Sequence, residues 1–451
     1  MLTFRNSLKI WVNSLKSGNL QKLQDDLITL SVPNLKSGIV VKNEKIKIDS
    51  ENHINEVNFQ ITNNVNSPTK HIVFIHGYGA SLGCFSRNFS MANLFTDLNH
   101  NYHIHFLDNK SFGLSSNPKI PGISNYIPKC PTIKLNDDQP TDPKKLYNKY
   151  YKLVDSYEIN PKEFKDYEEK FSPILNQIED YYLDGIKHWK TARGIEIDYL
   201  VGHSYGGYWS GSYAIKNDVG KLILLSPVGV ERHVHALPGV RHIDQSQDTL
   251  ALKPSLDPSQ YNFLSRFPIL KPETISKWYF QPYLPRVLRY LGPLGVQLYW
   301  KMWYSKLAKI NKLKEKRKSD GKTDPQNVYG TDRELSSIIE YLYNSITNGT
   351  MSDIYIKYLL TPSTVSKIPL YDKFMNFKNT DNRFGKFNIH FIYGQYDFMN
   401  AEAAEKLVSE LNSDDEVVKF HKIDEGGHNL YIDNPFDTNK LIYDIVKADE
   451  K

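Results

Sequence analysis

A serine in a glycine-rich stretch is the residue of this sequence best placed to act as a nucleophile. Ser204 lies in Gly202-His203-Ser204-Tyr205-Gly206, which matches the pattern G-x-S-x-G. The pattern marks a nucleophile when a strand precedes it and a helix follows, because the strained turn between them exposes the serine oxygen. Residues 198–202 read as a strand and 205–217 as a helix, so both conditions are met. The flanking Gly202 and Gly206 relieve backbone crowding in this nucleophile elbow, and Ser204 is predicted to attack an acyl carbonyl.

The attack would create an oxyanion that needs two backbone N–H donors set in advance. One donor is expected from Tyr205, directly after the serine. The second is expected from Tyr78, in the loop His76-Gly77-Tyr78-Gly79 that follows an apolar strand. We interpret His76 as a structural histidine that bridges groups of this loop, since a second histidine base is not needed.

A carboxylate and a histidine should follow the serine in chain order. Asp397 comes after the apolar run 387–393 and is the predicted acid. His428 lies in a loop before the last helix and is the predicted general base. Two rivals fit less well, because Asp424 is too close in sequence to the loop of His428 and His421 falls within an expected strand.

The strands and helices that must position these residues alternate along the chain. Expected strands are 38–41, 57–61, 71–76, 102–108, 198–202, 221–225, 387–393 and 417–423, and expected helices are 85–98, 164–193, 205–217, 400–411 and 435–448. Such alternation predicts an α/β fold with a mostly parallel central sheet and helices on both faces. The alternation stops in residues 230–385, which are largely helical in pattern. We therefore expect a large helical cap inserted before the strand that leads to Asp397.

This pattern divides the chain into four parts. Residues 1–35 form a basic amphipathic segment, 36–229 the first part of the core, 230–385 the cap, and 386–451 the second part of the core. Within the first part, residues 117–163 are rich in Pro, Asn, Asp and Lys and are interpreted as a partly disordered surface insertion.

The motifs together resemble those of the α/β-hydrolase superfamily. The resemblance rests on the loop at 76–80, on 111–116, on His188-Trp189, on the elbow at 202–208, on 226–229 and on the block 428–435. Within this superfamily, the sequence resembles most closely the subfamily of the lipid-droplet lipase co-activator and the N-acyl phospholipid lipase. Fungal relatives there include a mitochondrial cardiolipin-specific deacylase and a lysophosphatidic acid acyltransferase. In this family the last block is described as an acyltransferase-like H-x4-D motif, and here its histidine is also the predicted base, His428.

Composition limits the remaining function classes. The 451 residues are 40% hydrophobic and 24% charged, as in ordinary globular proteins, and the formal net charge of +5 does not argue for a nucleic-acid partner. Two cysteines exclude a disulfide framework. No cofactor or metal is implied, because the pair His233 and His235 has no third ligand near it in sequence.

A lysine-rich stretch in the expected cap has two interpretations. Trp300, Trp303, Leu307 and Ile310 recur at helical spacing, and lysines that include Lys309, Lys312 and Lys316 surround them. An anionic bilayer surface would suit such a helix, so Trp300, Trp303 and the three lysines are candidate membrane-binding residues. Alternatively, the helix packs on the core and its lysines face solvent.

The first 24 residues are basic, with no acid, and Leu8, Trp11, Val12 and Leu15 share one helical face. This is the form of a mitochondrial transit peptide, and a surface helix of the folded protein is the alternative. We expect a peripheral protein of the mitochondrial inner membrane, with the cytosol and the lipid droplet as alternatives.

The expected function is a serine hydrolase that cleaves acyl esters of phospholipids, of which the resemblance favours cardiolipin. Transfer of the acyl group to lysophosphatidic acid is the first alternative, because hydrolysis and transfer share one acyl-enzyme. A non-enzymatic lipase co-activator at a lipid surface is the second, and the intact Ser204, Asp397 and His428 disfavour it.

Overall fold

The computed structural model describes residues 2–32, 35–124, 157–237, 248–253, 284–322, 328–361, 365–386, 388–412 and 417–450, with parts of 127–156 and 255–261. The stretches between these ranges lie outside the described residues, and they include much of the expected insertion at 117–163.

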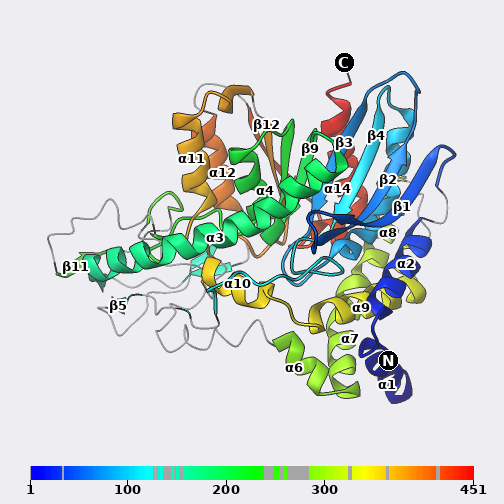
Figure 1. Ribbon diagram of the computed structural model, residues 1–451, viewed down its shortest axis with the longest axis horizontal. Helices are drawn as coiled ribbons and strands as arrows, with labels where there is room; N and C mark the ends of the chain where they lie inside the picture. The colour runs from blue at the N-terminus through cyan, green and yellow to red at the C-terminus, as the bar shows by residue number, and fades with distance from the viewer. Residues whose placement is uncertain are drawn as a thin grey trace.

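An eight-stranded sheet forms the centre of the molecule (Figure 1), in the order β1-β2-β4-β3-β9-β10-β12-β13. β3 (Thr69–Ile75), β4 (Asn101–Leu107), β9 (Tyr199–His203), β10 (Lys221–Leu225), β12 (Asn388–Gly394) and β13 (Val418–Ile423) run parallel. β1 (Ile39–Lys47) and β2 (His53–Ile61) are antiparallel to each other, and β2 is antiparallel to β4. The predicted mostly parallel sheet is confirmed. Because parallel strands end at the same edge, the sheet brings distant segments of the chain together there.

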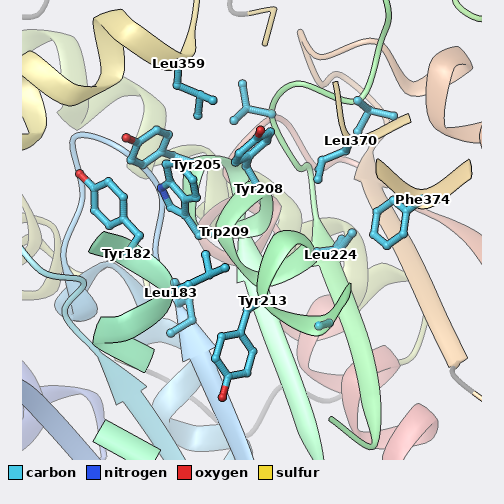
Figure 2. Packing of buried hydrophobic residues seen from close by; sticks show 14 of the residues in the cluster. Tyr182, Leu183, Tyr205, Tyr208, Trp209, Tyr213, Leu224, Leu359, Leu370 and Phe374 are labelled. Atoms are coloured by element: carbon cyan, nitrogen blue, oxygen red, sulfur yellow. The ribbon is translucent and has the colours of Figure 1, made fainter. Parts of the chain in front are cut away.

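Helices cover both faces of the sheet. On one face, α3 (Pro161–Arg193), α4 (Ser204–Lys216), α11 (Leu370–Thr380) and α12 (Ala401–Leu411) contribute to one apolar cluster. Figure 2 shows aromatic side chains of α3 and α4 at its centre, where the rings of Tyr182 and Trp209 stack with centroids 4.7 Å apart. On the other face lie η1 (Leu82–Asp97) and α14 (Pro435–Lys447). The helix expected at 85–98 is thus a longer 3-10 helix, η1.

The cap is inserted between β10 and β12, as predicted. Its described helices are α6 (Leu284–Tyr290), α7 (Pro293–Leu307), α8 (Lys309–Ser319), α9 (Asp332–Thr347) and α10 (Ser352–Leu359). A buried ion pair joins cap and core, because Arg87 Nε of η1 lies 2.6 Å from Glu334 Oε1 of α9. The expected end of the cap at residue 385 needs correction: α11 packs on α4, and its Phe374 contacts Phe391 of β12, so α11 belongs to the core layer.

The basic N-terminal segment forms two helices. α1 (Phe4–Ser14) packs against α7, and α2 (Asn19–Ser31) packs against α9 and η1. The indole of Trp11 donates a hydrogen bond from Nε1 to the carbonyl oxygen of Arg289, 2.9 Å away. Among the described residues, no helix is both long and apolar enough to cross a bilayer.

Short strands occur within the expected surface insertion. β5 (Lys134–Leu135) and β8 (Tyr157–Ile159) form a small sheet with β11 (Leu250–Leu252) of the following segment. β6 (Lys144–Leu146) pairs with β7 (Lys149–Tyr151). The described part of the insertion therefore has more regular structure than its composition indicates. Two further short elements of the described chain are η4 (Phe384–Lys386) and α13 (Leu430–Asp433).

Candidate active site

The serine of the glycine-rich motif sits at a strained junction between strand and helix. β9 ends at His203 and α4 begins at Ser204, whose φ of 52° lies in the left-handed region. A Cβ at Gly202 would come 2.4 Å from Ser210 Oγ, and one at Gly206 would come 2.3 Å from the carbonyl oxygen of His76. Real Cβ atoms do not approach other atoms so closely. The predicted need for glycine on both sides of the elbow thus has a steric cause.

Three segments that are far apart in sequence meet at Ser204. His428, in the loop after β13, has its Nε2 3.0 Å from Ser204 Oγ and its Nδ1 3.0 Å from Asp397 Oδ1. Asp397 follows β12, so all three side chains come from the carboxyl ends of parallel strands. The structure thus brings together the predicted nucleophile, base and acid in one hydrogen-bonded chain.

Asp397 is held as a carboxylate although only 5% of its surface is exposed to solvent. Burial by itself raises the pKa of Asp397, but the charge of His428 and hydrogen bonds from His428 and the Met399 backbone outweigh it and lower the pKa to about 2. The Met399 amide donates to Oδ1 across 2.9 Å. A carboxylate in this position fixes the histidine tautomer, with the proton on Nδ1 and a free acceptor at Nε2 facing the serine.

The loop after β3 lies directly beside Ser204. A Cβ at Gly77 would come 2.9 Å from His203 Nδ1 and 3.0 Å from Ser204 Cβ, so glycine favours this close approach. Tyr78 is fixed there by its hydroxyl, which donates to Asp353 Oδ1 of α10 across 2.7 Å. Tyr205 lies in the first turn of α4, where backbone N–H groups have no acceptor within the helix. Tyr205 therefore follows the serine directly, and Tyr78 follows the glycine that lies beside it.

The other histidines near the strand ends are accounted for structurally. The buried His76 lies 2.8 Å from the Gly77 carbonyl through Nδ1, and its Nε2 accepts from the Asn109 amide at 3.1 Å. Burial lowers the pKa of His76 to about 4. His421, a rival for the base, instead bonds His390 across 2.9 Å. Asp424, a rival for the acid, is exposed.

His203 connects the elbow to the loop of His428 through a contact that the sequence does not predict. Its Nε2 lies 3.0 Å from the backbone carbonyl of His428, and burial holds its pKa well below the usual range. A neutral ring with its proton on Nε2 donates to that carbonyl and so ties the elbow to the loop of the base. The only hint of this contact in the sequence is that His203 occupies the variable position directly before the serine in G-x-S-x-G.

Metal-capable groups lie away from this site. The buried His233 accepts a hydrogen bond from the amide of His235, and among the described residues no third ligand joins them. The one group of three in the described chain is His71, His103 and His105, on β3 and β4. There His71 Nδ1 and His105 Nε2 lie 3.0 Å apart, and His105 also bonds Glu56.

Comparison with known proteins identifies the fold. Residues 72–439, which contain the whole hydrogen-bonded chain, match the family described as "Alpha/beta hydrolase family". The chain belongs to this family.

Relatives of this α/β hydrolase include proteins of yeast, plants and animals. It is 27% identical to "Protein ECM18" of Saccharomyces cerevisiae, over 99% of this chain and 85% of that protein. It is 26% identical to "1-acylglycerol-3-phosphate O-acyltransferase ICT1" of the same yeast, over 83% and 80% of the two chains. The human "1-acylglycerol-3-phosphate O-acyltransferase ABHD5" is 23% identical over 42% of this chain and 37% of its own. These relatives confirm the predicted subfamily.

The histidine of the H-x4-D block in this α/β hydrolase pairs with a different acid. His428 bonds Asp397, whereas Asp433 accepts a hydrogen bond from the Gly427 amide across 3.0 Å. Asp433 of this block therefore stabilises the conformation of the loop that carries His428. It does not form a second His–Asp pair beside the first.

The lysine-rich stretch of the cap differs from the single helix expected for it. It consists of α7 and α8, which meet at Ala308, and the apolar residues Leu307 and Ile310 are buried in the core. Trp300 and Trp303 are half-buried against the same cluster. The apolar face proposed for a bilayer is thus a packing face, in line with the alternative interpretation. The lysines, however, do not simply face solvent: Lys309, Lys312 and Lys316 line a pocket of 680 Å³ that also contains His428.

Proposed function

We propose that this α/β hydrolase cleaves acyl esters of phospholipids, with Ser204 as nucleophile, His428 as general base and Asp397 as the acid that orients it. The observation that carries the proposal is the continuous chain of two 3.0 Å contacts from Ser204 Oγ through His428 to Asp397. The family of the chain and the relatives named as acyltransferases support acyl chemistry on lipids.

The first half of the reaction follows from this arrangement. Ser204 Oγ attacks the acyl carbonyl carbon while His428 Nε2 takes its proton, and Asp397 stabilises the imidazolium. The tetrahedral oxyanion accepts hydrogen bonds from the backbone N–H groups of Tyr205 and Tyr78. His428 then returns the proton to the leaving alcohol, the C–O bond breaks, and an acyl-enzyme remains on Ser204.

The second half decides between two activities. Water attacking the acyl-enzyme gives a fatty acid, whereas a lysolipid hydroxyl gives a new diacyl lipid. We propose hydrolysis, with cardiolipin as the favoured substrate in acyl-chain remodelling. The second candidate is acyl transfer to lysophosphatidic acid, which the names of the yeast, rice, Arabidopsis and human relatives favour. A purely non-enzymatic co-activator would not need the assembled serine, histidine and aspartate.

We further propose that the enzyme works at a membrane surface and meets it through α1 and α7. Both helices expose large apolar side chains at helical spacing, Phe4, Leu8 and Val12 on α1 and Leu294, Leu298 and Met302 on α7, each at least 40% exposed. The two helices pack side by side (Figure 1) and contain no acidic residue. An apolar surface on helices that lack negative charge suits an anionic bilayer.

Vesicle flotation tests this surface. With phosphatidylcholine vesicles that contain one fifth phosphatidate, the triple variant Leu294→Ser, Leu298→Ser, Met302→Ser should float less than the parent protein. Val65→Ser, which changes an apolar side chain that is 88% exposed on a loop, is the matched control. Equal flotation of all three proteins would contradict the proposal.

A mitochondrial inner-membrane location, with the cytosol or lipid droplet as alternatives, is tested by fractionation of cells that express the full chain.

Product analysis tests the activity itself. Purified protein is incubated with cardiolipin or phosphatidate vesicles, with and without lysophosphatidic acid, and products are identified by mass spectrometry. The proposal predicts released fatty acid that requires Ser204, including in the absence of an acceptor. New diacyl lipid that appears only with lysophosphatidic acid would favour the second candidate, and no Ser204-dependent product from any lipid would contradict both.

A further inference from the structure

The pocket beside the base has one wall made largely of lysines. The end of α7 and one face of α8 contribute Lys306, Lys309, Lys312 and Lys316. The facing wall comes from the loops after β12 and β13, which also carry Asp397 and His428, and includes Phe398, His428 and Asp433. The ring of Phe398 lies 4.4 Å from that of His428. The pocket and Ser204 thus share His428.

The packing of α8 fixes which way its lysines point. Ile310 is buried in the core and anchors one side of the helix, whereas the buried Leu313 lines the pocket together with the lysines. Lys309, Lys312 and Lys316 follow the spacing i, i+3, i+7 and therefore share a single face. That face lines the pocket, so the position of the lysines is set by the apolar contacts behind them.

The charges of this wall are only partly balanced. Lys316 pairs with Glu425, with Nζ 2.8 Å from Oε1, and Lys306 stacks over the ring of Trp303 at 5.4 Å. Among the described residues, Lys309 and Lys312 form no ion pair within 4.0 Å. Asp433 also lines the pocket, and burial raises its pKa, although a hydrogen bond from the Gly427 amide and the charges of Arg87 and Lys309 act in the opposite direction. Two neighbouring ammonium groups are therefore left facing the pocket.

We propose that Lys309 and Lys312 bind the phosphate of a glycerophospholipid whose acyl ester is placed at Ser204. The inference rests on the proposed function and adds to it the residues that recognise the phosphate next to the acyl ester. Lysine binds phosphate as a mobile point charge, and two of them one helical turn apart can contact one phosphate together. The pocket volume of 680 Å³ is within the range of small-ligand sites and would admit a headgroup.

An exposed lysine pair could instead attract phosphate on a bilayer, so the test uses esters that are soluble as monomers. Dihexanoyl phosphatidate and dihexanoylglycerol have the same acyl chains and differ in the phosphate. Below the concentration at which either aggregates, no surface is present. Any preference for the phosphate-bearing ester then arises in the pocket.

The decisive variant is Lys309→Gln with Lys312→Gln, and its control is Lys318→Gln with Lys322→Gln. Both remove two charges from the same region, but Lys318 and Lys322 are exposed and do not line the pocket. We expect the pocket variant to reduce the ratio of kcat/KM for phosphatidate over diacylglycerol at least about tenfold, mainly through KM, because hydrogen bonds between charged groups are lost. The control variant should leave the ratio unchanged.

Two results would overturn the inference while the proposed function stands. The first is Ser204-dependent hydrolysis of both esters with no preference for phosphatidate. The second is an equal fall of the ratio in both variants, which would indicate general electrostatic attraction.

A binding measurement tests the phosphate site independently of hydrolysis. If neither ester is hydrolysed, that result counts against the proposed function, but the binding measurement still decides whether the lysines bind phosphate. Titration of Ser204→Ala protein with glycerol 3-phosphate should give saturable binding that weakens at least about tenfold when Lys309 and Lys312 are also replaced. No saturable binding, or equal binding with and without the lysines, would overturn the phosphate site.

Discussion

His203 and His428 are joined by a contact between a side chain and a backbone: the Nε2 of His203 lies 3.0 Å from the carbonyl oxygen of His428. The first residue ends β9 directly before Ser204, the proposed nucleophile, and the second is the proposed base, in a loop 225 residues later. The contact ties the loop of His428 to the elbow, so we expect the 3.0 Å distance from His428 Nε2 to Ser204 Oγ to depend on it.

Removing this contact should slow turnover without abolishing it. We expect His203→Ala to lower kcat roughly ten- to a hundredfold with a smaller change in KM, because a small displacement of a catalytic group is costly. His203→Gln retains a donor at a similar distance from the backbone and should recover part of kcat. Steady-state kinetics on a soluble ester measures both. If the two variants lose kcat equally, the hydrogen bond does not position His428.

Replacing the proposed acid, Asp397, should reduce activity strongly, but less than replacing the proposed nucleophile, Ser204. We expect Asp397→Asn to reduce kcat by roughly four orders of magnitude, against roughly six for Ser204→Ala, since an amide favours the wrong histidine tautomer. Asp424→Asn makes the same chemical change at an exposed position near the base and should be silent. A crippling Asp424→Asn with a silent Asp397→Asn would reverse the assignment of the acid.

The steric demand of the elbow can be tested through stability. Gly206→Ala would place a Cβ 2.3 Å from the carbonyl oxygen of His76, so the turn must shift. We expect the free energy of unfolding to fall by roughly 1–3 kcal/mol or more, and activity to fall with it. Gly385→Ala is the matched control, because a Cβ there meets nothing within 4 Å. Chemical denaturation of both variants provides the comparison, and equal stability would contradict the steric account.

Buried histidines should make the protein sensitive to acid. Burial lowers the pKa of both His76 and His235 to about 4, below the value near 6.5 of the unfolded chain. Between these values the unfolded state binds more protons, so stability is present above about pH 6.5 and is lost as the pH falls towards 4. The fully buried His76 contributes on the order of 3 kcal/mol over this window, and the half-buried His235 contributes less because solvent screens it.

Asp108 acts in the opposite direction, because burial raises its pKa to about 6, and it recovers part of the loss. Urea denaturation at pH 7 and pH 4.5 should show lower stability at the acidic pH, with a smaller difference in His235→Asn. Equal stability at the two pH values would show that these rings are not held neutral by the fold.

The sequence contains enough local information to predict the core of the site. The elbow, the loop of Tyr78 and the ends of the strands before Asp397 and His428 each have a nearby signal, in glycine spacing or in apolar runs. Parallel strands then place their carboxyl ends at one edge, which explains why three such distant residues could be assigned together.

Features that depend on long-range packing could not be predicted in this way. The contact of His203 with His428 spans 225 residues and leaves no pattern in the sequence. Periodicity places Lys309 and Lys312 on a polar helical face, but it cannot distinguish a face towards solvent from one towards a pocket. Periodicity likewise cannot tell which apolar residues of the cap are buried. Leu307 and Ile310 are buried, whereas Leu294 and Leu298 are exposed.

Labelling with a fluorophosphonate tests the central claim most directly, because the reagent forms a covalent bond only with an activated serine and releases fluoride. The account predicts a single adduct by intact mass, mapped to the peptide that contains Ser204 and absent from the folded Ser204→Ala variant. Folded wild-type protein that gains no adduct, or gains it at another residue, would contradict the assignment of Ser204 as the nucleophile.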